Sequence, residues 1–114
     1  MSFSIKKQGD VVVVDVEGQL IVGNRQELKQ KVLDELEKGE KKFLIDFSQT
    51  GYIDSSGLGE LVSSYTTVRN KGGDVKLLKL TSKTKDLLQM TKLLTVLDVY
   101  DDEAKAINSL KGQK

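Results

Sequence analysis

Two adjacent serines stand near the middle of the sequence, in the stretch Asp54-Ser55-Ser56-Gly57-Leu58-Gly59. This stretch leads from an apolar run into a predicted helix, whose first N–H groups are unpaired and lie at the positive end of the helix dipole. A serine hydroxyl at such a position can cap the helix, accept a phosphate group or act as a nucleophile. The simplest interpretation is that Asp54 or Ser55 is only the N-cap, a role worth about 1 kcal/mol.

Gly57 and Gly59 make this purely structural interpretation incomplete. Each glycine costs a helix about 1 kcal/mol relative to alanine, so a helix selected only for stability would avoid two of them in its first turn. Small residues also leave the backbone and the hydroxyls open to a large partner. The residues alone therefore leave two interpretations open, a helix cap and a site at which another macromolecule acts.

The sequence of 114 residues contains no histidine and no cysteine. Disulfides, thiol nucleophiles and zinc-thiolate sites are excluded, and the usual general base is missing. Ser82 and Lys85 match Ser-x-x-Lys, but the companion motifs of acyl-transfer enzymes are absent. Without a Gly-x-x-x-x-Gly-Lys loop we expect no bound ATP, and we expect no cofactor and no metal site. The acidic run 101–103 is better explained as a helix start.

The net charge of +1 gives no electrostatic reason to expect nucleic acid or an anionic membrane as a partner. The first ten residues are polar and strand-like, and they lack the apolar stretch that is typical of a signal peptide. We also read no transmembrane span in the sequence. We therefore expect a cytoplasmic protein.

Hydrophobic periodicity predicts alternating strands and helices. We expect strands at Phe3–Ile5, Val11–Val16, Phe43–Phe47, Val75–Leu80 and, shorter, Val96–Tyr100, with a loop at Ser48–Ile53. We expect helices at 24–38, from the serine stretch to Val68, from Thr81 or Ser82 through Met90, and from Asp101 and Asp102 through Leu110. This order predicts an α/β fold in one domain over residues 1–114, with a mixed sheet of four to five strands and about four helices. The first two strands form a hairpin that adds an antiparallel strand.

The stretch from Gly51 to Gly59, preceded by the apolar run 43–47, resembles the signature of STAS domains, specifically the anti-sigma factor antagonists. The likeness extends across the chain. It includes the early hairpin and the segments Gly18-Gln19-Leu20, Gly72-Gly73 and Thr91-Lys92-Leu93. The resemblance implies a STAS-like fold and a regulatory function rather than an enzymatic one.

The resemblance also implies a mechanism. Ser55, the first serine after the aspartate, would be phosphorylated by an anti-sigma factor that is also a serine kinase. The unphosphorylated antagonist would bind this kinase, which then releases its sigma factor. Phosphorylation would end the complex, and a PP2C-type phosphatase would reset it. We expect the protein to be a monomer.

Two groups of residues around Ser55 are assigned roles in this mechanism. Asp54, Ser56 and Gly57 are expected to support the turn, Asp54 through hydrogen bonds of its side chain. The predicted partner surface comprises Ile21, Val22, Asn24, Leu58, Gly59 and Glu60. We expect Glu60 to be a solvated residue on an exposed helical turn.

Ile21 and Val22 depart from the family pattern, which often has a polar residue just before the first helix. They either pack as strand or staple residues, or form an apolar part of the partner surface. Two other functions remain open beside the phosphorylation switch. One is a STAS scaffold or adaptor without regulated phosphorylation, and the other is a hydrolase with a serine nucleophile. The hydrolase is disfavoured because the sequence offers no convincing base for the serine.

Overall fold

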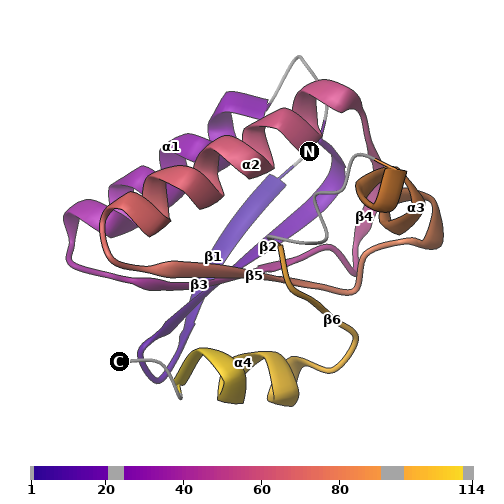
Figure 1. Cartoon of the computed structure of the whole chain (residues 1–114). Coiled ribbons are helices and arrows are strands. Elements are labelled where there is room, and N and C mark those ends of the chain that lie inside the picture. The colour runs from indigo at the N-terminus through magenta and orange to yellow at the C-terminus, as the bar shows by residue number, and fades with distance from the viewer. Residues whose placement is uncertain (1, 21–24, 91–96, 112–114) are drawn as a thin grey trace.

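The structure is a computed structural model, and it describes residues 2–20, 25–90 and 97–111. Figure 1 shows its elements in space. The strands are β1 (Ser2–Gln8), β2 (Val11–Leu20), β3 (Lys42–Asp46), β4 (Thr50–Ile53), β5 (Asp74–Leu78) and β6 (Val99–Tyr100). The helices are α1 (Arg25–Glu37), α2 (Ser55–Asn70), α3 (Ser82–Met90) and α4 (Glu103–Lys111). The predicted α/β class and the four predicted helices are confirmed.

The described strands form one mixed sheet in the order β1-β2-β3-β5-β6, with β4 paired to β2. β1 and β2 are antiparallel, as the hairpin prediction requires, whereas all other pairs are parallel. Gly9 adopts a φ of 66° in the tight turn between β1 and β2, a conformation that favours glycine.

The predicted loop at Ser48–Ile53 is wrong, because its last four residues form β4 and raise the number of strands to six. β2 is ten residues long and β3 only five, so the second half of β2 extends past β3 and accepts β4 beside it. The register shifts at Gly18, whose φ is 95°. The hydroxyl of Thr50 donates to the carbonyl oxygen of Val16 at 2.7 Å and fixes the start of β4.

Two apolar clusters lie on the two faces of the sheet. Alternate residues of β2 point to opposite faces, so Val12 and Val14 belong to the larger cluster and Val11 and Val13 to the smaller one. α1 and α2 cover the face of the larger cluster, and α4 covers the other, as Figure 1 shows. Because β2 is buried on both faces, its residues 11–14 form a continuous apolar run in the sequence.

The helix boundaries follow local signals. The hydroxyl of Thr81 accepts from the backbone N–H of Thr84 at 3.2 Å, so Thr81 and not Ser82 caps α3. Asp102 accepts from the N–H of Ala104 at 2.9 Å and begins α4, as predicted. Gly39 follows α1 with a φ of 96° and confirms the predicted stop. The predicted cap at Asn24 lies outside the described residues.

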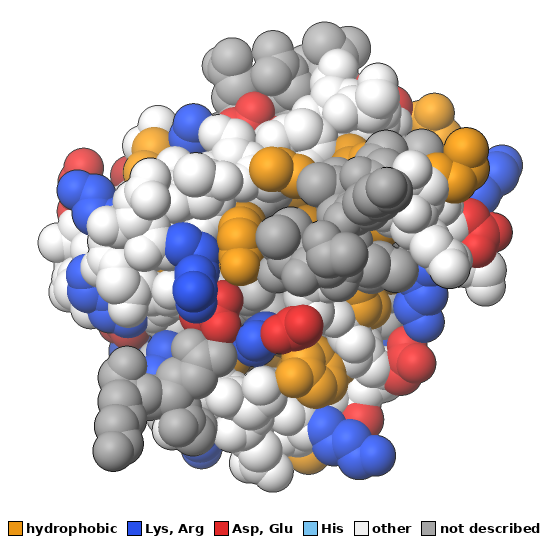
Figure 2. Space-filling model, viewed as in Figure 1, with side chains coloured by type: hydrophobic (Ala, Val, Ile, Leu, Met, Phe, Trp, Pro, Cys, Tyr) orange, Lys and Arg blue, Asp and Glu red, His pale blue; other side chains and the backbone are white. Residues whose placement is uncertain are grey.

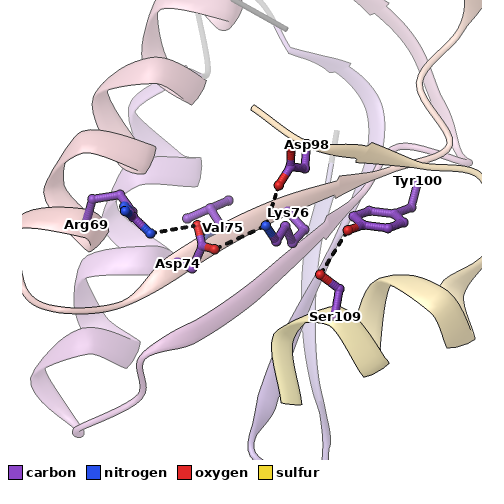
Figure 3. Close-up of polar contacts among 7 residues, drawn as sticks. All are labelled: Arg69, Asp74, Val75, Lys76, Asp98, Tyr100 and Ser109. Carbon is purple, nitrogen blue, oxygen red and sulfur yellow. Dashed lines mark hydrogen bonds and ion pairs between the residues drawn. The ribbon is translucent and has the colours of Figure 1, made fainter. Parts of the chain in front are cut away.

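A group of paired charges joins β5 to the segment that leads into β6, as Figure 3 shows. Lys76 is 7% exposed and pairs with Asp74 at 3.2 Å and with Asp98. Arg69 of α2 approaches the same Asp74 at 3.7 Å. Burial acts to lower the pKa of Lys76, but the hydrogen bond to Asp98 and the charge of Asp74 outweigh it and raise this pKa. The ammonium group therefore stays charged inside the fold.

Candidate functional site

The serine stretch forms the turn between β4 and α2. Asp54 is the N-cap of α2, with an extended backbone (φ −90°, ψ −179°). Its side-chain oxygen Oδ1 accepts from the N–H of Gly57 at 2.8 Å, and its carbonyl oxygen accepts from the N–H of Leu58 at 2.9 Å. The side chain of Asp54 thus satisfies one N–H group of the first helical turn, in agreement with its predicted role in ordering the turn.

With Asp54 as the cap, neither serine is needed to start the helix. Ser55 is the first residue of α2 and is exposed, whereas Ser56 is half-buried and Gly57 is buried. The hydroxyl of Ser55 therefore lies at the positive end of a helix of 16 residues, open to solvent. Of the two serines, Ser55 is therefore the more accessible from outside.

Gly59 has no structural reason to be a glycine. A Cβ atom built at Gly59 would meet nothing within 4 Å, and its backbone is helical. An alanine would fit there and would favour the helix by about 1 kcal/mol. The absence of a side chain therefore leaves the first turn of α2 open to close approach from outside.

The predicted partner surface is only partly accessible. Leu58 is 5% exposed and belongs to the larger core cluster, so its side chain cannot contribute to a surface. Gly59 is exposed, as a contact residue must be. Ile21, Val22 and Asn24 lie outside the described residues.

The prediction that Glu60 is solvated is wrong, because Glu60 is only 7% exposed. It stands three residues after Gly57 and four before Ser64, and residues at these spacings lie on one face of a helix. Gly57 and Ser64 are both buried, and α2 packs along α1 on this side. None of these three residues is apolar, so hydrophobic periodicity in the sequence does not reveal the burial of Glu60.

A hollow of about 620 Å³ opens beside Ser55, between the β4–α2 turn and α3. Tyr52 and Met90 line it together with Ser55, Asp54 and Lys83. Tyr52 is 51% exposed and Met90 81% exposed. Neither residue was predicted to be part of the site, since Met90 was assigned only to the end of a predicted helix.

A second hollow of about 300 Å³ lies around Gly39, Gly72 and the start of β3. Its charged side chains have partners within the chain. Lys42 pairs with Asp10 at 2.8 Å, and Lys41 donates to the carbonyl oxygen of Lys71. This hollow therefore offers less free chemistry than the one beside Ser55.

The charges on the surface are mixed. Figure 2 shows basic and acidic side chains interspersed, with small apolar patches between them, on the face seen in Figure 1. Among the described residues, no group of three or more histidine, cysteine or acidic side chains could hold a metal ion. In the same part of the chain, no helix is long and apolar enough to cross a membrane.

The sequence model of the STAS domain matches residues 2–106, which is most of the chain. This chain is a STAS domain. The fold supports the assignment, because a solved structure from Thermotoga maritima superimposes with a TM-score of 0.89 at 29% identity. That structure, provisionally named an anti-sigma factor antagonist, is matched over 96% of this chain and 94% of its own.

Curated relatives of this STAS domain carry the same kind of name. A protein of Thermotoga neapolitana, also provisionally named an anti-sigma factor antagonist, is 30% identical over 97% of this chain and 99% of its own length. The anti-sigma-B factor antagonist of Bacillus subtilis is 26% identical over 87% of this chain and 90% of its own. At 19% identity, the anti-sigma factor antagonist SpoIIAA shares the fold in its unphosphorylated and phosphorylated forms, with TM-scores of 0.77 and 0.75.

Proposed function

We propose that this STAS domain is an anti-sigma factor antagonist that is switched by phosphorylation of Ser55. The unphosphorylated protein binds an anti-sigma factor that is a serine kinase, and this binding releases the sigma factor. The observation that carries the proposal is the exposed hydroxyl of Ser55 at the start of α2, beside a cap that Asp54 alone provides. The names of the relatives similar over nearly the whole chain support the regulatory role.

The position of Ser55 explains how one phosphate group can control binding. A phosphoserine adds a charge of about −1.5 to −2. Within the chain this charge is tolerated, because the N-terminus of α2 offers its dipole and its N–H groups. At an interface the same charge must be desolvated or repelled, which can remove several kcal/mol of binding. The switch then works by local electrostatics, with little change in the fold.

The partners of this protein carry out the transfer and the removal of the phosphate group. Without histidine or cysteine, the chain offers no obvious base to activate Ser55 itself. The kinase brings ATP and Mg²⁺, and a PP2C-type phosphatase removes the phosphate. The proposal includes a cytoplasmic location and a monomeric domain.

Substitution of Ser55 tests the proposal. We expect Ser55→Ala to bind the cognate anti-sigma kinase as tightly as the wild type and to gain no phosphate. We expect Ser55→Asp to bind at least about tenfold more weakly, because a buried charge at an interface costs more than about 1.4 kcal/mol. Affinity is measured by calorimetry, and phosphorylation by intact mass after incubation with kinase and ATP.

Ser56→Ala is the matched control, because Ser56 is the neighbouring hydroxyl and is half-buried. It should bind and gain one phosphate group like the wild type. Equal affinities of Ser55→Asp and Ser55→Ala would contradict the switch. Binding without any phosphate transfer would instead favour a STAS scaffold or adaptor.

A further inference from the structure

Large apolar side chains are exposed at three positions in the described part of the chain, namely Ile5, Tyr52 and Met90. Tyr52 and Met90 both line the hollow beside Ser55, although they come from β4 and from the end of α3. One exposed apolar residue is ordinary in a folded protein. Two of them on one hollow indicate an interaction surface.

The shape of this hollow suits a protruding apolar segment. Its volume of about 620 Å³ is within the range of pockets that hold ligands, about 300–1,000 Å³. Met90, at 81% exposure, has a flexible side chain that adapts to different partner shapes. Tyr52 offers a rigid ring with a polar end, a combination that is enriched in protein interfaces.

We propose that this hollow, which we name the Tyr52–Met90 groove, is the docking site for an apolar segment of the kinase that phosphorylates Ser55. This inference rests on the function proposed above. Ser55 lies on the wall of the same groove. An enzyme that reaches the hydroxyl of Ser55 must therefore cover the groove, so the docking surface is continuous with the surface around the phosphate acceptor.

The charges of the groove favour an uncharged occupant. Asp54, Lys83 and Asp86 contribute both signs to its lining, so no strong potential selects a charged segment. Tyr52 and Met90 supply the apolar contacts instead. A phosphate group on Ser55 then places about two negative charges beside an apolar contact, where their desolvation opposes binding. The groove thus explains why phosphorylation ends the complex.

Substitution of Met90 tests the groove without touching the phosphate acceptor. The wild-type chain, Met90→Asp, Met90→Leu and Ile5→Asp are incubated with the cognate anti-sigma serine kinase, ATP and Mg²⁺, and the rate of phosphate gain is followed by intact mass. Ile5→Asp is the matched control, because it puts the same charge at an exposed apolar residue of β1, outside the groove. Circular dichroism and the melting temperature show whether each variant is folded.

We expect Met90→Asp to lower kcat/KM at least about tenfold, mainly through KM, as loss of an apolar interface contact does. Met90→Leu and Ile5→Asp should stay within about twofold of the wild type. Hydrogen exchange of the Ser55→Ala variant with bound kinase should show protection of residues 82–90 but not of β1.

The failures of the two proposals can be told apart. If the wild type neither binds the kinase nor gains a phosphate, the proposed function is wrong. The docking proposal then fails as well, because it depends on that kinase. If the wild type is phosphorylated at Ser55 but folded Met90→Asp is phosphorylated equally well, the groove is not the docking site. A Met90→Asp variant that changes only the oligomeric state in sedimentation would show that a second copy of the chain occupies the groove.

Discussion

Two regions of the molecule, one around Lys76 of β5 and one around Ser55 at the start of α2, treat polar groups in opposite ways. Around Lys76, charged side chains are held by one another, with Asp74 and Asp98 on either side of a buried ammonium group. Around Ser55, the hydroxyl and two large apolar side chains are left exposed after Asp54 has satisfied the helix start. The side chains around Lys76 stabilise the fold, whereas those around Ser55 are exposed and can contact a partner.

This difference gives a physical criterion for the site. Groups that stabilise the fold are expected to be costly to remove, because their partners are left buried without compensation. Removal of a group that only a partner contacts should change the stability of the isolated domain little but should weaken the binding of the partner. Stability and binding measurements on matched pairs of variants can separate the two regions.

The largest effect is expected for Lys76→Met. This change leaves Asp74, which is 5% exposed, without its closest ammonium partner, and should lower the free energy of unfolding by about 3 kcal/mol. Lys83→Met is the control at an exposed lysine of the Tyr52–Met90 groove and should change stability by less than about 0.5 kcal/mol. Urea unfolding measures both. Equal losses for the two lysines would remove the distinction between the regions.

A smaller effect is expected from two glycines. A Cβ atom at Gly73 would overlap the carbonyl oxygen of Lys41 and approach the side chain of Val68 at 2.8 Å. Gly73→Ala should therefore destabilise the domain by about 2 kcal/mol. Gly59→Ala meets nothing within 4 Å and should stabilise it by up to about 1 kcal/mol, while weakening the binding of the kinase. Thermal unfolding and calorimetry test both; a Gly59→Ala variant with unchanged affinity would show that this backbone is not approached closely.

The sequence predicted the parts of this picture that depend on local signals. The apolar run of β3 and the cap at Asp54 are each contained within a few residues, and both were found within about two residues of their true bounds. β4 was missed because its sequence Thr-Gly-Tyr-Ile is buried only at its two ends and contains no apolar run. Its pairing depends on the length of β2, which is far away in the sequence.

The candidate site shows the same limit. Ser55 could be singled out from its own stretch and from the family resemblance, but Met90 could not. Met90 joins the groove only because β5 delivers α3 next to the β4–α2 turn, as Figure 1 shows. Whether an apolar side chain of an amphipathic helix is core or surface depends on this placement. The spacing of residues within one helix or strand does not predict which distant segment of the chain will lie beside it.

The smallest effect is expected for a pair of like charges on β2 and β3, outside the region around Lys76. Asp15 of β2 is opposite Asp46 of β3 in the parallel register. Burial raises the pKa of Asp15 above its ordinary value of 3.8, and the hydrogen bond and charge of Asp46 raise it further. The ammonium group of Lys6 acts in the opposite direction, while the carboxylate of Glu103 adds to the increase. At neutral pH these like charges oppose the fold.

The sign of the pH dependence follows from this shift. Between its ordinary and its raised pKa, Asp15 binds more protons in the folded chain than in the unfolded one, so stability falls as the pH rises through this interval. Asp15→Asn should therefore be more stable than the wild type at pH 7, and this advantage should shrink as the pH falls toward the ordinary value. Asp10→Asn is the control with the opposite sign, because the hydrogen bond from Lys42 lowers the pKa of Asp10. Asp10→Asn should be the less stable chain at pH 7, with a deficit that shrinks only as the pH falls through the lowered pKa. If urea unfolding from pH 7 to 4 gives parallel curves for Asp15→Asn and the wild type, the pKa of Asp15 is not raised in the folded chain, and its charge does not oppose the fold.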